Sequence, residues 1–164
     1  MTTYNEWGKL KKVIVGVADN AVIPSLDLGY RTVLAADKLN EKDIVHSINY
    51  PQIVIDEANE DLDTLVNFLQ KESVEVLRPN RSITSFFNYC PRDSVVTYGN
   101  DSYAAPMSIK IRTDEYKAFE HHLSNLHILD RYHEDDLYNI SCVGNKNILA
   151  LTDAAPAFDA ANII

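Results

Sequence analysis

The sequence predicts a single α/β domain that spans residues 1–164. Two observations favour this fold class. Short apolar runs rich in β-branched residues, each ended by Gly, Pro or polar residues, are typical of strands. Two segments with apolar residues at helical spacing lie between these runs, so that strands and helices alternate in an order that indicates a sandwich or a wheel. The composition, 46% hydrophobic and 24% charged, is that of a globular protein with a sizeable core.

The strands expected from these runs are short. They are Lys12–Val17, Val74–Leu77, Ser94–Tyr98 and Asn147–Thr152, with Tyr103–Met107 as the return arm of a hairpin. Residues 18–50, which lie after the first strand, are irregular and polar and predict a long loop of the kind that is often functional. The last ten residues, Ala155–Ile164, are small or apolar and predict one more strand, which approaches a buried site.

Two helices are expected. In residues 52–72 the apolar side chains recur at helical spacing, and acidic residues crowd the first half, where the helix dipole favours anions. Residues 113–126 form the second helix, with Thr113 as its N-cap and with Tyr116 and Phe119 on one apolar stripe that continues to Leu126. No strand-to-helix turn carries the Gly-rich pattern of a nucleotide-binding fold.

The charge excludes some partners. A formal net charge of −9 argues against a nucleic-acid surface and fits either a small cationic ligand or solubility alone. No apolar stretch is long enough to span a bilayer, and the polar first residues do not resemble a signal peptide. Cys90 and Cys142 have no metal-ligand spacing, which predicts a reducing compartment, so we expect a cytoplasmic location and no cofactor.

Asp93 is the first candidate functional residue. It lies in Tyr89-Cys90-Pro91-Arg92-Asp93, immediately before a predicted strand, where Pro91 fixes the backbone. A carboxylate held there can accept two hydrogen bonds from a guanidinium group. On local sequence alone, a surface pair of Arg92 with Asp93, or a turn cap, is the favoured interpretation.

Asp159 is the second candidate, in Phe158-Asp159-Ala160-Ala161. A carboxylate among small and apolar residues is costly to bury unpaired, and the two alanines leave room for a ligand. The alternative, an acidic residue in a frayed terminus, is equally favoured by the residues themselves.

The thiols and imidazoles give weaker candidates. Arg92 could lower the pKa of Cys90, but a small buried hydrophobic role is favoured for this cysteine and for Cys142. His121 and His122 are adjacent on the predicted second helix and are expected to point to different faces, so they form no metal-ligand pair. His133 precedes an acidic run that matches no metal loop, and no metal site is expected.

Four blocks, in order along the chain, carry a resemblance to a known family. They are Asn5–Gly16; Ala18–Ala21 with Pro24; Pro91–Asp93 followed by Val95–Val96, Gly99–Asn100 and Ala105–Met107; and Thr152 with Pro156 and Phe158–Ala161. Together these blocks resemble the glycine (arginine:glycine) amidinotransferases, which are guanidino-modifying enzymes of the pentein fold. The resemblance covers the whole chain in pieces and matches the N-terminal portion of the family.

The resemblance implies roles for both aspartates. The match to Asp93 binds the substrate guanidinium, and the match to Asp159 is the catalytic carboxylate that pairs with a histidine. Asn162 stands where the family usually has a second aspartate, and it is expected near the site together with Arg92 and Asn20. The sequence separation of Asp93 and Asp159 permits them to converge, but only the resemblance implies that they do.

The resemblance also implies a reaction. A cysteine thiolate attacks the central guanidinium carbon of L-arginine, a histidine handles the protons, and the amidino group passes to an acceptor amine. Both of those residues belong to the family's C-terminal half, and nothing in this sequence matches them, so the chain alone is expected to be inactive. Neither Cys90 nor His133 takes their place.

The implied architecture is about two αββαβ units of a five-unit wheel, truncated after the Phe158–Ala161 block. An open wheel exposes apolar surface and strand edges, so a homo-oligomer, or a second chain that supplies the missing half, is expected. Three hypotheses follow. They are an amidinotransferase-like chain that needs a partner, a module that binds guanidino compounds without turnover, and an interaction protein in which the family residues serve only the fold.

Overall fold

The structure is a computed structural model of the chain. It describes residues 2–5, 7–23, 48–83, 87–107, 109, 112–129, 138–143, 146–151 and 157–162, and for residues 48, 138–143 and 146–151 it describes the backbone alone. Expectations about His46, His133, Pro24, Thr152 and Pro156 therefore lie outside the described residues. No helix in these ranges is long and apolar enough to cross a membrane.

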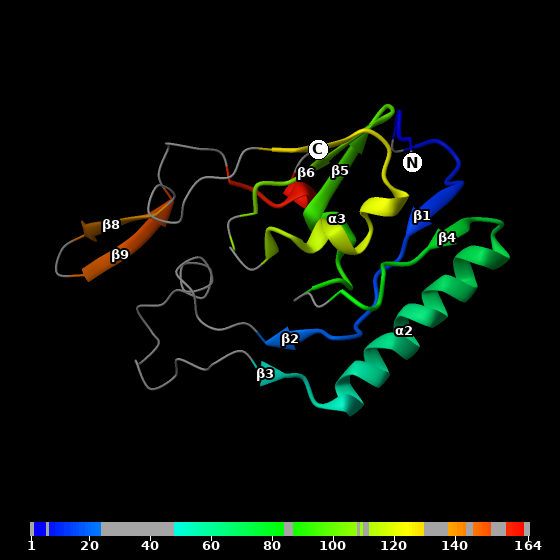
Figure 1. Cartoon of the computed structure of the whole chain (residues 1–164), viewed down its shortest axis with the longest axis horizontal. Coiled ribbons are helices and arrows are strands. Elements are labelled where there is room, and N and C mark those ends of the chain that lie inside the picture. The colour runs from blue at the N-terminus through cyan, green and yellow to red at the C-terminus, as the bar shows by residue number, and fades with distance from the viewer. Residues whose placement is uncertain are drawn as a thin grey trace.

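Strands and helices alternate along the described chain (Figure 1). The strands are β1 (Lys12–Ile14), β2 (Val22–Ile23), β3 (Ile48–Asn49), β4 (Glu75–Leu77), β5 (Val95–Tyr98), β6 (Asp101–Ala104), β7 (Leu126–Ile128), β8 (Tyr138–Val143) and β9 (Lys146–Leu151). The helices are α2 (Gln52–Lys71), the short α3 (Pro91–Ser94), and the 3-10 turns η4 (Glu115–Ala118), η5 (Glu120–His122) and η6 (Ala160–Asn162). The predicted α/β class is thus observed.

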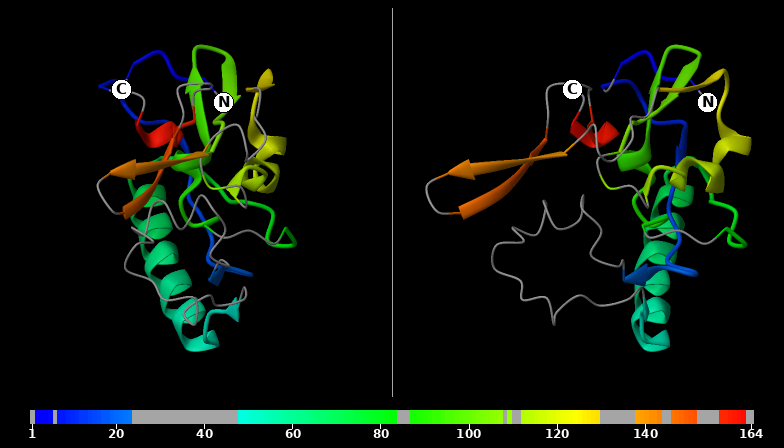
Figure 2. Two further views of the ribbon diagram at one scale, coloured as in Figure 1. Left: turned by 90° about the vertical axis from the view of Figure 1, so that its left-hand side faces the viewer. Right: turned by 60° about the vertical axis from the view of Figure 1, so that its left-hand side comes forward.

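The strands form several small sheets. β1 pairs in parallel with β4, which brings the two ends of the strand–helix–strand unit around α2 side by side. β5, β6 and β7 form a three-stranded sheet, antiparallel between β5 and β6 and parallel between β6 and β7. The pairs β2–β3 and β8–β9 are antiparallel, and the β8–β9 hairpin lies at the end of the molecule opposite α2 (Figure 2).

α2 matches the long predicted helix almost residue for residue. Its partly buried positions recur at helical spacing, at Ile55, Ala58, Asn59, Leu62, Val66 and Leu69. This stripe packs against β4, and Asn59 Oδ1 accepts a hydrogen bond of 2.9 Å from the backbone N–H of Ala18. None of the residues of α2 is fully buried. The helix therefore covers one side of the β1–β4 pair while most of its own surface stays exposed.

The second predicted helix is wrong. Residues 115–122 form the two 3-10 turns, and Leu126 lies in β7, paired with Ser102 of β6. The chain leaves the turns at Asn125, whose φ of 44° is left-handed, and the backbone carbonyl of Asn125 accepts a hydrogen bond from the Ser102 N–H. The apolar stripe itself is real, because Tyr116 and Phe119 are buried in the core with Leu123 and Leu126 packed against them.

Two further expectations need correction. The C-terminal run was expected to be a strand, but residues 160–162 form η6, and Ala160 packs with Ala105 and Met107. The buried part of the first predicted strand lies beyond β1, at residues 15–17, where the Val17 N–H donates to the Asn88 carbonyl at 3.2 Å. Gly16 permits this approach, because a Cβ atom there would lie 2.3 Å from the Tyr89 Cα atom.

Candidate active site

Asp93 lies on α3, a single helical turn directly before β5. Pro91 occupies the first turn, where its missing N–H costs no hydrogen bond, and the Asp93 N–H donates to the Cys90 carbonyl oxygen at 3.2 Å. The next residue, Ser94, is buried, and its carbonyl accepts a hydrogen bond from the Ala105 N–H. Ser94 is thus anchored in the core, while the neighbouring Asp93 side chain lies at the edge of the core and is 28% exposed.

Asp93 forms an ion pair with Arg112, not with its neighbour Arg92. Arg112 Nη2 donates to Asp93 Oδ2 at 3.1 Å, and the Arg112 side chain is only 4% exposed. Arg92 is exposed on α3. The local surface pair that the sequence favours for Asp93 is therefore replaced by a pair that joins α3 to the segment before η4.

The buried Glu115 is the second carboxylate that binds Arg112. Glu115 Oε2 accepts hydrogen bonds from Arg112 Nε at 3.0 Å and from Ser94 Oγ at 3.1 Å, while its Oε1 accepts one from the Phe87 N–H at 2.8 Å. The Glu115 side chain is 1% exposed. Burial alone lowers the pKa of Arg112, but the charges and hydrogen bonds of Glu115 and Asp93 raise that pKa above its usual value, so Arg112 stays cationic.

Asp159 reaches the same place from the far end of the chain. Its neighbours anchor it: the Phe158 N–H donates to the Pro106 carbonyl at 3.2 Å, and Ala160 is buried against Ala105 and Met107. η6, which begins at Ala160, packs against α3 and β5. The structure therefore brings Asp93 and Asp159 together, although 65 residues lie between them in the sequence.

The Asp159 carboxylate is in an unusual state. Its Oδ1 atom is buried, with no hydrogen-bond partner in the described part of the chain. Burial raises the pKa of Asp159 above its ordinary value, the Arg112 charge lowers this pKa, and the Asp93 charge raises it again. An acceptor that is buried, unpartnered and close to a second carboxylate is suited to a cationic hydrogen-bond donor.

The other two expected neighbours have different surroundings. Asn162 is exposed, and its backbone N–H donates to the Asp159 carbonyl at 2.9 Å, which closes the η6 turn. Asn20 is exposed with a left-handed φ of 58°, and its side chain donates to the Arg81 carbonyl at 2.7 Å. The described contacts of Asn20 thus belong to a second polar network, not to the Asp93–Asp159 pair.

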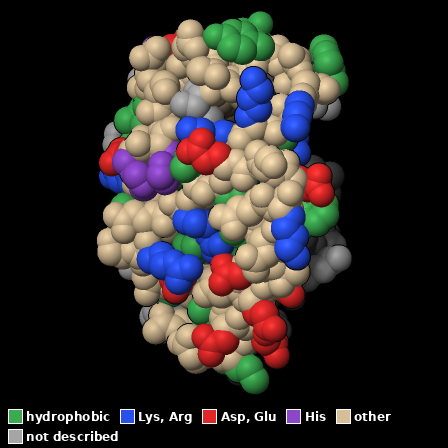
Figure 3. All heavy atoms as spheres, turned by 90° about the vertical axis from the view of Figure 1, so that its right-hand side faces the viewer, with side chains coloured by type: hydrophobic (Ala, Val, Ile, Leu, Met, Phe, Trp, Pro, Cys, Tyr) green, Lys and Arg blue, Asp and Glu red, His purple; other side chains and the backbone are tan. Residues whose placement is uncertain are grey.

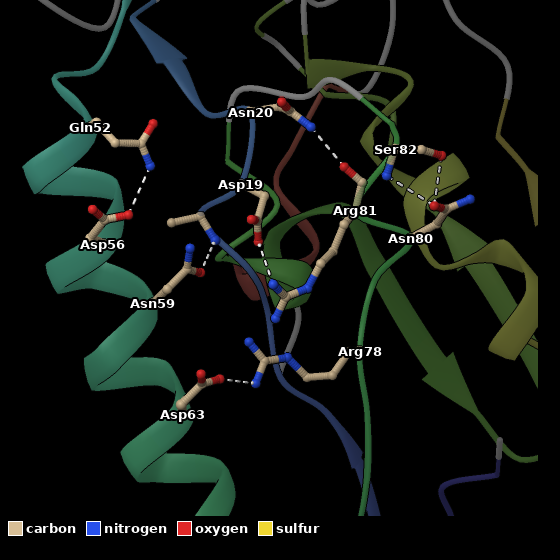
Figure 4. A network of polar contacts seen from close by, with 11 residues as sticks. Asp19, Asn20, Gln52, Asp56, Asn59, Asp63, Arg78, Asn80, Arg81 and Ser82 are labelled. Atoms are coloured by element: carbon tan, nitrogen blue, oxygen red, sulfur yellow. Dashed lines mark hydrogen bonds and ion pairs between the residues drawn. The ribbon is translucent and has the colours of Figure 1, made fainter.

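This second network lies between α2 and the segments at residues 18–20 and 78–82 (Figure 4). Arg78 Nη1 contacts Asp63 Oδ1 at 2.8 Å, and Arg81 Nη1 lies 3.4 Å from Asp19 Oδ2. The space-filling view shows acidic side chains gathered at the lower end of this face, with basic ones above them (Figure 3). Because these charges neutralise one another across elements, we assign the network to the docking of α2.

Among the side chains that the structure describes, the thiol and imidazole groups provide no second site. Burial raises the pKa of the Cys90 thiol, and the Asp93 charge raises it further, so Cys90 is a poor nucleophile. The His121 and His122 rings lie 3.8 Å apart between centroids, so the expectation that they point to different faces is wrong. Among the described residues, no group of three or more His, Cys, Asp or Glu side chains could hold a metal ion.

Sequence reasoning missed Arg112 and Glu115. The local sequence gives little signal, because Arg112 and Glu115 lie in a charged stretch with Lys110 and Asp114, which is typical of a solvated surface segment. Their partner Asp93 lies 19 residues before Arg112, and no local pattern points across that gap.

Comparisons with known proteins agree over the whole chain. The inosamine-phosphate amidinotransferase 1 of Streptomyces glaucescens is 30% identical in an alignment of 184 residues. The alignment covers 100% of this chain and 52% of the relative. The mitochondrial glycine amidinotransferase of Gallus gallus is 26% identical and is covered over 46% of its length. This chain resembles one portion of the amidinotransferase family. No protein-family model matches it.

Solved structures give the same result for the amidinotransferase-like fold. The inosamine-phosphate amidinotransferase of Streptomyces griseus matches with a TM-score of 0.82 and 30% identity, over 98% of this chain and 51% of that one. An amidinotransferase of the saxitoxin biosynthetic pathway from Microseira wollei matches with a TM-score of 0.71 and 23% identity, which supports the fold alone. The chain spans about half the length of the curated relatives that it matches.

Proposed function

We propose that this chain forms the guanidine-binding part of an amidinotransferase, in which Asp93 and Asp159 hold the guanidinium group of L-arginine. The observation that carries the proposal is the buried, unpartnered Oδ1 of Asp159, close to the Asp93–Arg112 pair. The likeness to amidinotransferases over the whole chain supports it. A guanidinium group supplies the planar N–H donors that two opposed carboxylates can accept.

The fold proposal is equally specific. We propose that residues 1–164 form one domain with about two αββαβ units of a five-unit pentein wheel, and that the substrate lies near its axis. The parallel β1–β4 unit around α2 and the β5–β6–β7 sheet, both in the described residues, are the observations that support this proposal. In this proposal Asp93 belongs to the unit that contains the β5–β6–β7 sheet, and Asp159 to the segment that follows it.

The chemistry assigns each residue a limited task. The guanidinium is a delocalised cation and a poor electrophile, so Asp93 and Asp159 orient it and expose its central carbon. A thiolate then attacks that carbon, the bond to the leaving amine breaks, and a histidine donates the proton that this amine takes up. An acceptor amine then displaces the thiolate from the amidino carbon. We propose that the thiolate and the histidine come from residues beyond those of this sequence, so that the chain alone binds but does not transfer.

Isothermal titration of the chain with L-arginine tests this proposal, with glycine as the control ligand. We expect saturable binding at millimolar arginine or below, weakened at least about tenfold by Asp93→Ala because a charge-assisted pair is lost. Asp63→Ala is the matched control, since it removes another carboxylate that is ion-paired with an arginine. We expect no release of ornithine in the presence of arginine and glycine.

Each other outcome has a definite meaning. Absence of heat at millimolar arginine would reject the guanidine site and leave the fold as the conserved feature. Binding that Asp93→Ala leaves unchanged would place the ligand elsewhere. Release of ornithine by the purified chain would show that the chain itself holds the nucleophile, which contradicts the proposed division of labour.

A further inference from the structure

We infer that Arg112 is a positioning residue: locked by the buried Glu115, it holds the Asp93 carboxylate in one orientation for a guanidino ligand. This inference rests on the proposed function. Its basis is a chain of contacts that runs from the core to the candidate site, in which every link but the last is buried.

The first step is the lock on Arg112. Two of its donors reach Glu115 Oε2, Nε at 3.0 Å and Nη2 at 2.9 Å, and its guanidinium lies 4.8 Å above the centre of the Phe87 ring. Glu115 is in turn fixed by the Phe87 N–H and by Ser94 Oγ. A planar guanidinium held along one edge and over one face has little freedom left to rotate.

Arg112 also binds the Asp93 carboxylate. The same Nη2 that contacts Glu115 also donates to Asp93 Oδ2 at 3.1 Å. One edge of the Asp93 carboxylate is therefore tied to the core, while 28% of the side chain remains exposed to a ligand. A side chain that is already ordered loses less conformational entropy when a ligand binds, so the site gains affinity without a new contact.

The third step concerns charge. Three carboxylates, on Asp93, Glu115 and Asp159, act on one cation, Arg112, which leaves a formal charge of −2 for the cluster. Without Arg112, the carboxylates of Asp93, Glu115 and Asp159 would repel one another with no cation of the cluster to offset the repulsion. Arg112 thus lowers the electrostatic cost of keeping Asp93 and Asp159 together at the candidate site.

Two other roles for Arg112 fit the structure less well. Direct contact with the carboxylate of an amino-acid ligand needs an accessible guanidinium, but the Arg112 side chain is 4% exposed. Occupation of the site as an internal competitor needs a guanidinium that can be displaced, but Arg112 is bound to the buried Glu115 through both Nε and Nη2 and is only 4% exposed. The competitor role predicts tighter arginine binding when Arg112 is removed, which is the opposite of our inference.

Two measurements on the full chain test the inference. The first compares arginine titrations of the wild type, Arg112→Lys and Arg112→Gln, with Arg78→Lys as the matched control in the second network. Lysine keeps the charge but lacks the fork that contacts two carboxylates at once. We expect Arg112→Lys to weaken binding about tenfold and Arg112→Gln to weaken it more, with Arg78→Lys within about twofold of the wild type.

The second measurement needs no ligand. Side-chain coupling constants of Asp93, measured by NMR, report whether χ1 occupies one rotamer or averages over several. We expect a single rotamer in the wild type and averaging in Arg112→Lys, with circular dichroism to confirm that the variant is folded. If the Asp93 χ1 angle averages over several rotamers in the wild type, that result by itself overturns the inference, even if no Arg112 variant folds.

The outcomes separate the two proposals. A wild type that binds no arginine but holds Asp93 in one rotamer, released by Arg112→Lys, rejects the proposed function and keeps the positioning role. A wild type that binds arginine, with Arg112→Lys or Arg112→Gln equal to it or tighter, keeps the proposed function and rejects the positioning role.

Discussion

Asp159 shows at the scale of one residue how a binding role and stability oppose each other. Its Oδ1 atom is buried without a partner, and burial raises the pKa of this carboxylate above its ordinary value. A group whose pKa is raised on folding binds its proton more tightly in the folded state. The stability of the wild type therefore falls as pH rises from the ordinary aspartate range through the raised pKa of Asp159.

Asp159→Asn removes this titration and keeps the shape of the side chain. We expect the variant to have the higher melting temperature at pH 7, with the difference shrinking as pH falls below the ordinary pKa of aspartate. Thermal unfolding followed by circular dichroism across this range checks the trend. Asp63→Asn, at a carboxylate whose side chain is 55% exposed, is the control substitution. A variant that is less stable than the wild type at pH 7 would mean that Asp159 serves the fold.

The candidate residues differ in how far the sequence alone could identify them. Asp93 and Asp159 were identified by the resemblance of their blocks, since their local sequences favoured or equally allowed ordinary surface roles. Arg92 was the expected partner of Asp93 because it is adjacent, but the Arg92 side chain is exposed on α3 while Asp93 pairs with Arg112. The actual partner, Arg112, is set by tertiary packing, which no local pattern contains.

At the scale of elements, Glu115 joins three segments that the sequence does not link. It accepts hydrogen bonds from Phe87, from Ser94 at the end of α3, and from Arg112 before η4. Glu115→Ala would leave Arg112 as a buried cation paired only with Asp93, and a buried backbone donor unpaired. We expect a loss of about 3–5 kcal/mol in the free energy of unfolding.

Urea unfolding of Glu115→Ala measures this loss, and Glu120→Ala is the matched control because Glu120 is exposed on the neighbouring turn η5. We expect the control to stay within about 0.5 kcal/mol of the wild type. A loss below about 1 kcal/mol for Glu115→Ala would show that the three segments are held by apolar packing alone.

The elements also differ in how strongly their local sequence determines their secondary structure. α2 was predicted well because a long apolar stripe at helical spacing is a strong local signal. The expected helix at 113–126 failed because its stripe is compatible with two 3-10 turns followed by a strand, and pairing of Leu126 with Ser102 decides the outcome. η6 was expected as a strand, since short runs of small residues carry little preference of their own.

At the scale of the whole molecule, the described chain leaves much surface without a cover. Within the described residues, β1 pairs with β4 alone, so each strand of this parallel pair has an open edge, whereas parallel sheets are usually covered on both sides. α2 adds an apolar flank formed by Val54, Leu65 and Phe68, which are 42%, 45% and 60% exposed. These positions lie on one side of the helix. Leu65 follows Val54 by eleven residues, which is about three turns, and Phe68 follows Leu65 by three residues, which is a little less than one turn.

We propose that this flank mediates self-association of the chain, with two copies burying it against each other in an isologous dimer. A fully exposed apolar side chain contributes about 1.5–3 kcal/mol on burial, and these are about half exposed, so the six side chains of two copies contribute about 5–9 kcal/mol, which is comparable with the cost of association. Light scattering coupled to size exclusion at micromolar concentration should give twice the 18.5 kDa mass of the chain.

Leu65→Glu with Phe68→Glu should give the monomer mass and unchanged circular dichroism, because each copy then places two carboxylates in the contact. Asn67→Glu with Gln70→Glu adds the same charge at exposed polar positions on the side of α2 away from the flank and should leave the dimer intact. A monomeric wild type would reject self-association through this flank and favour a partner that carries the family's other half.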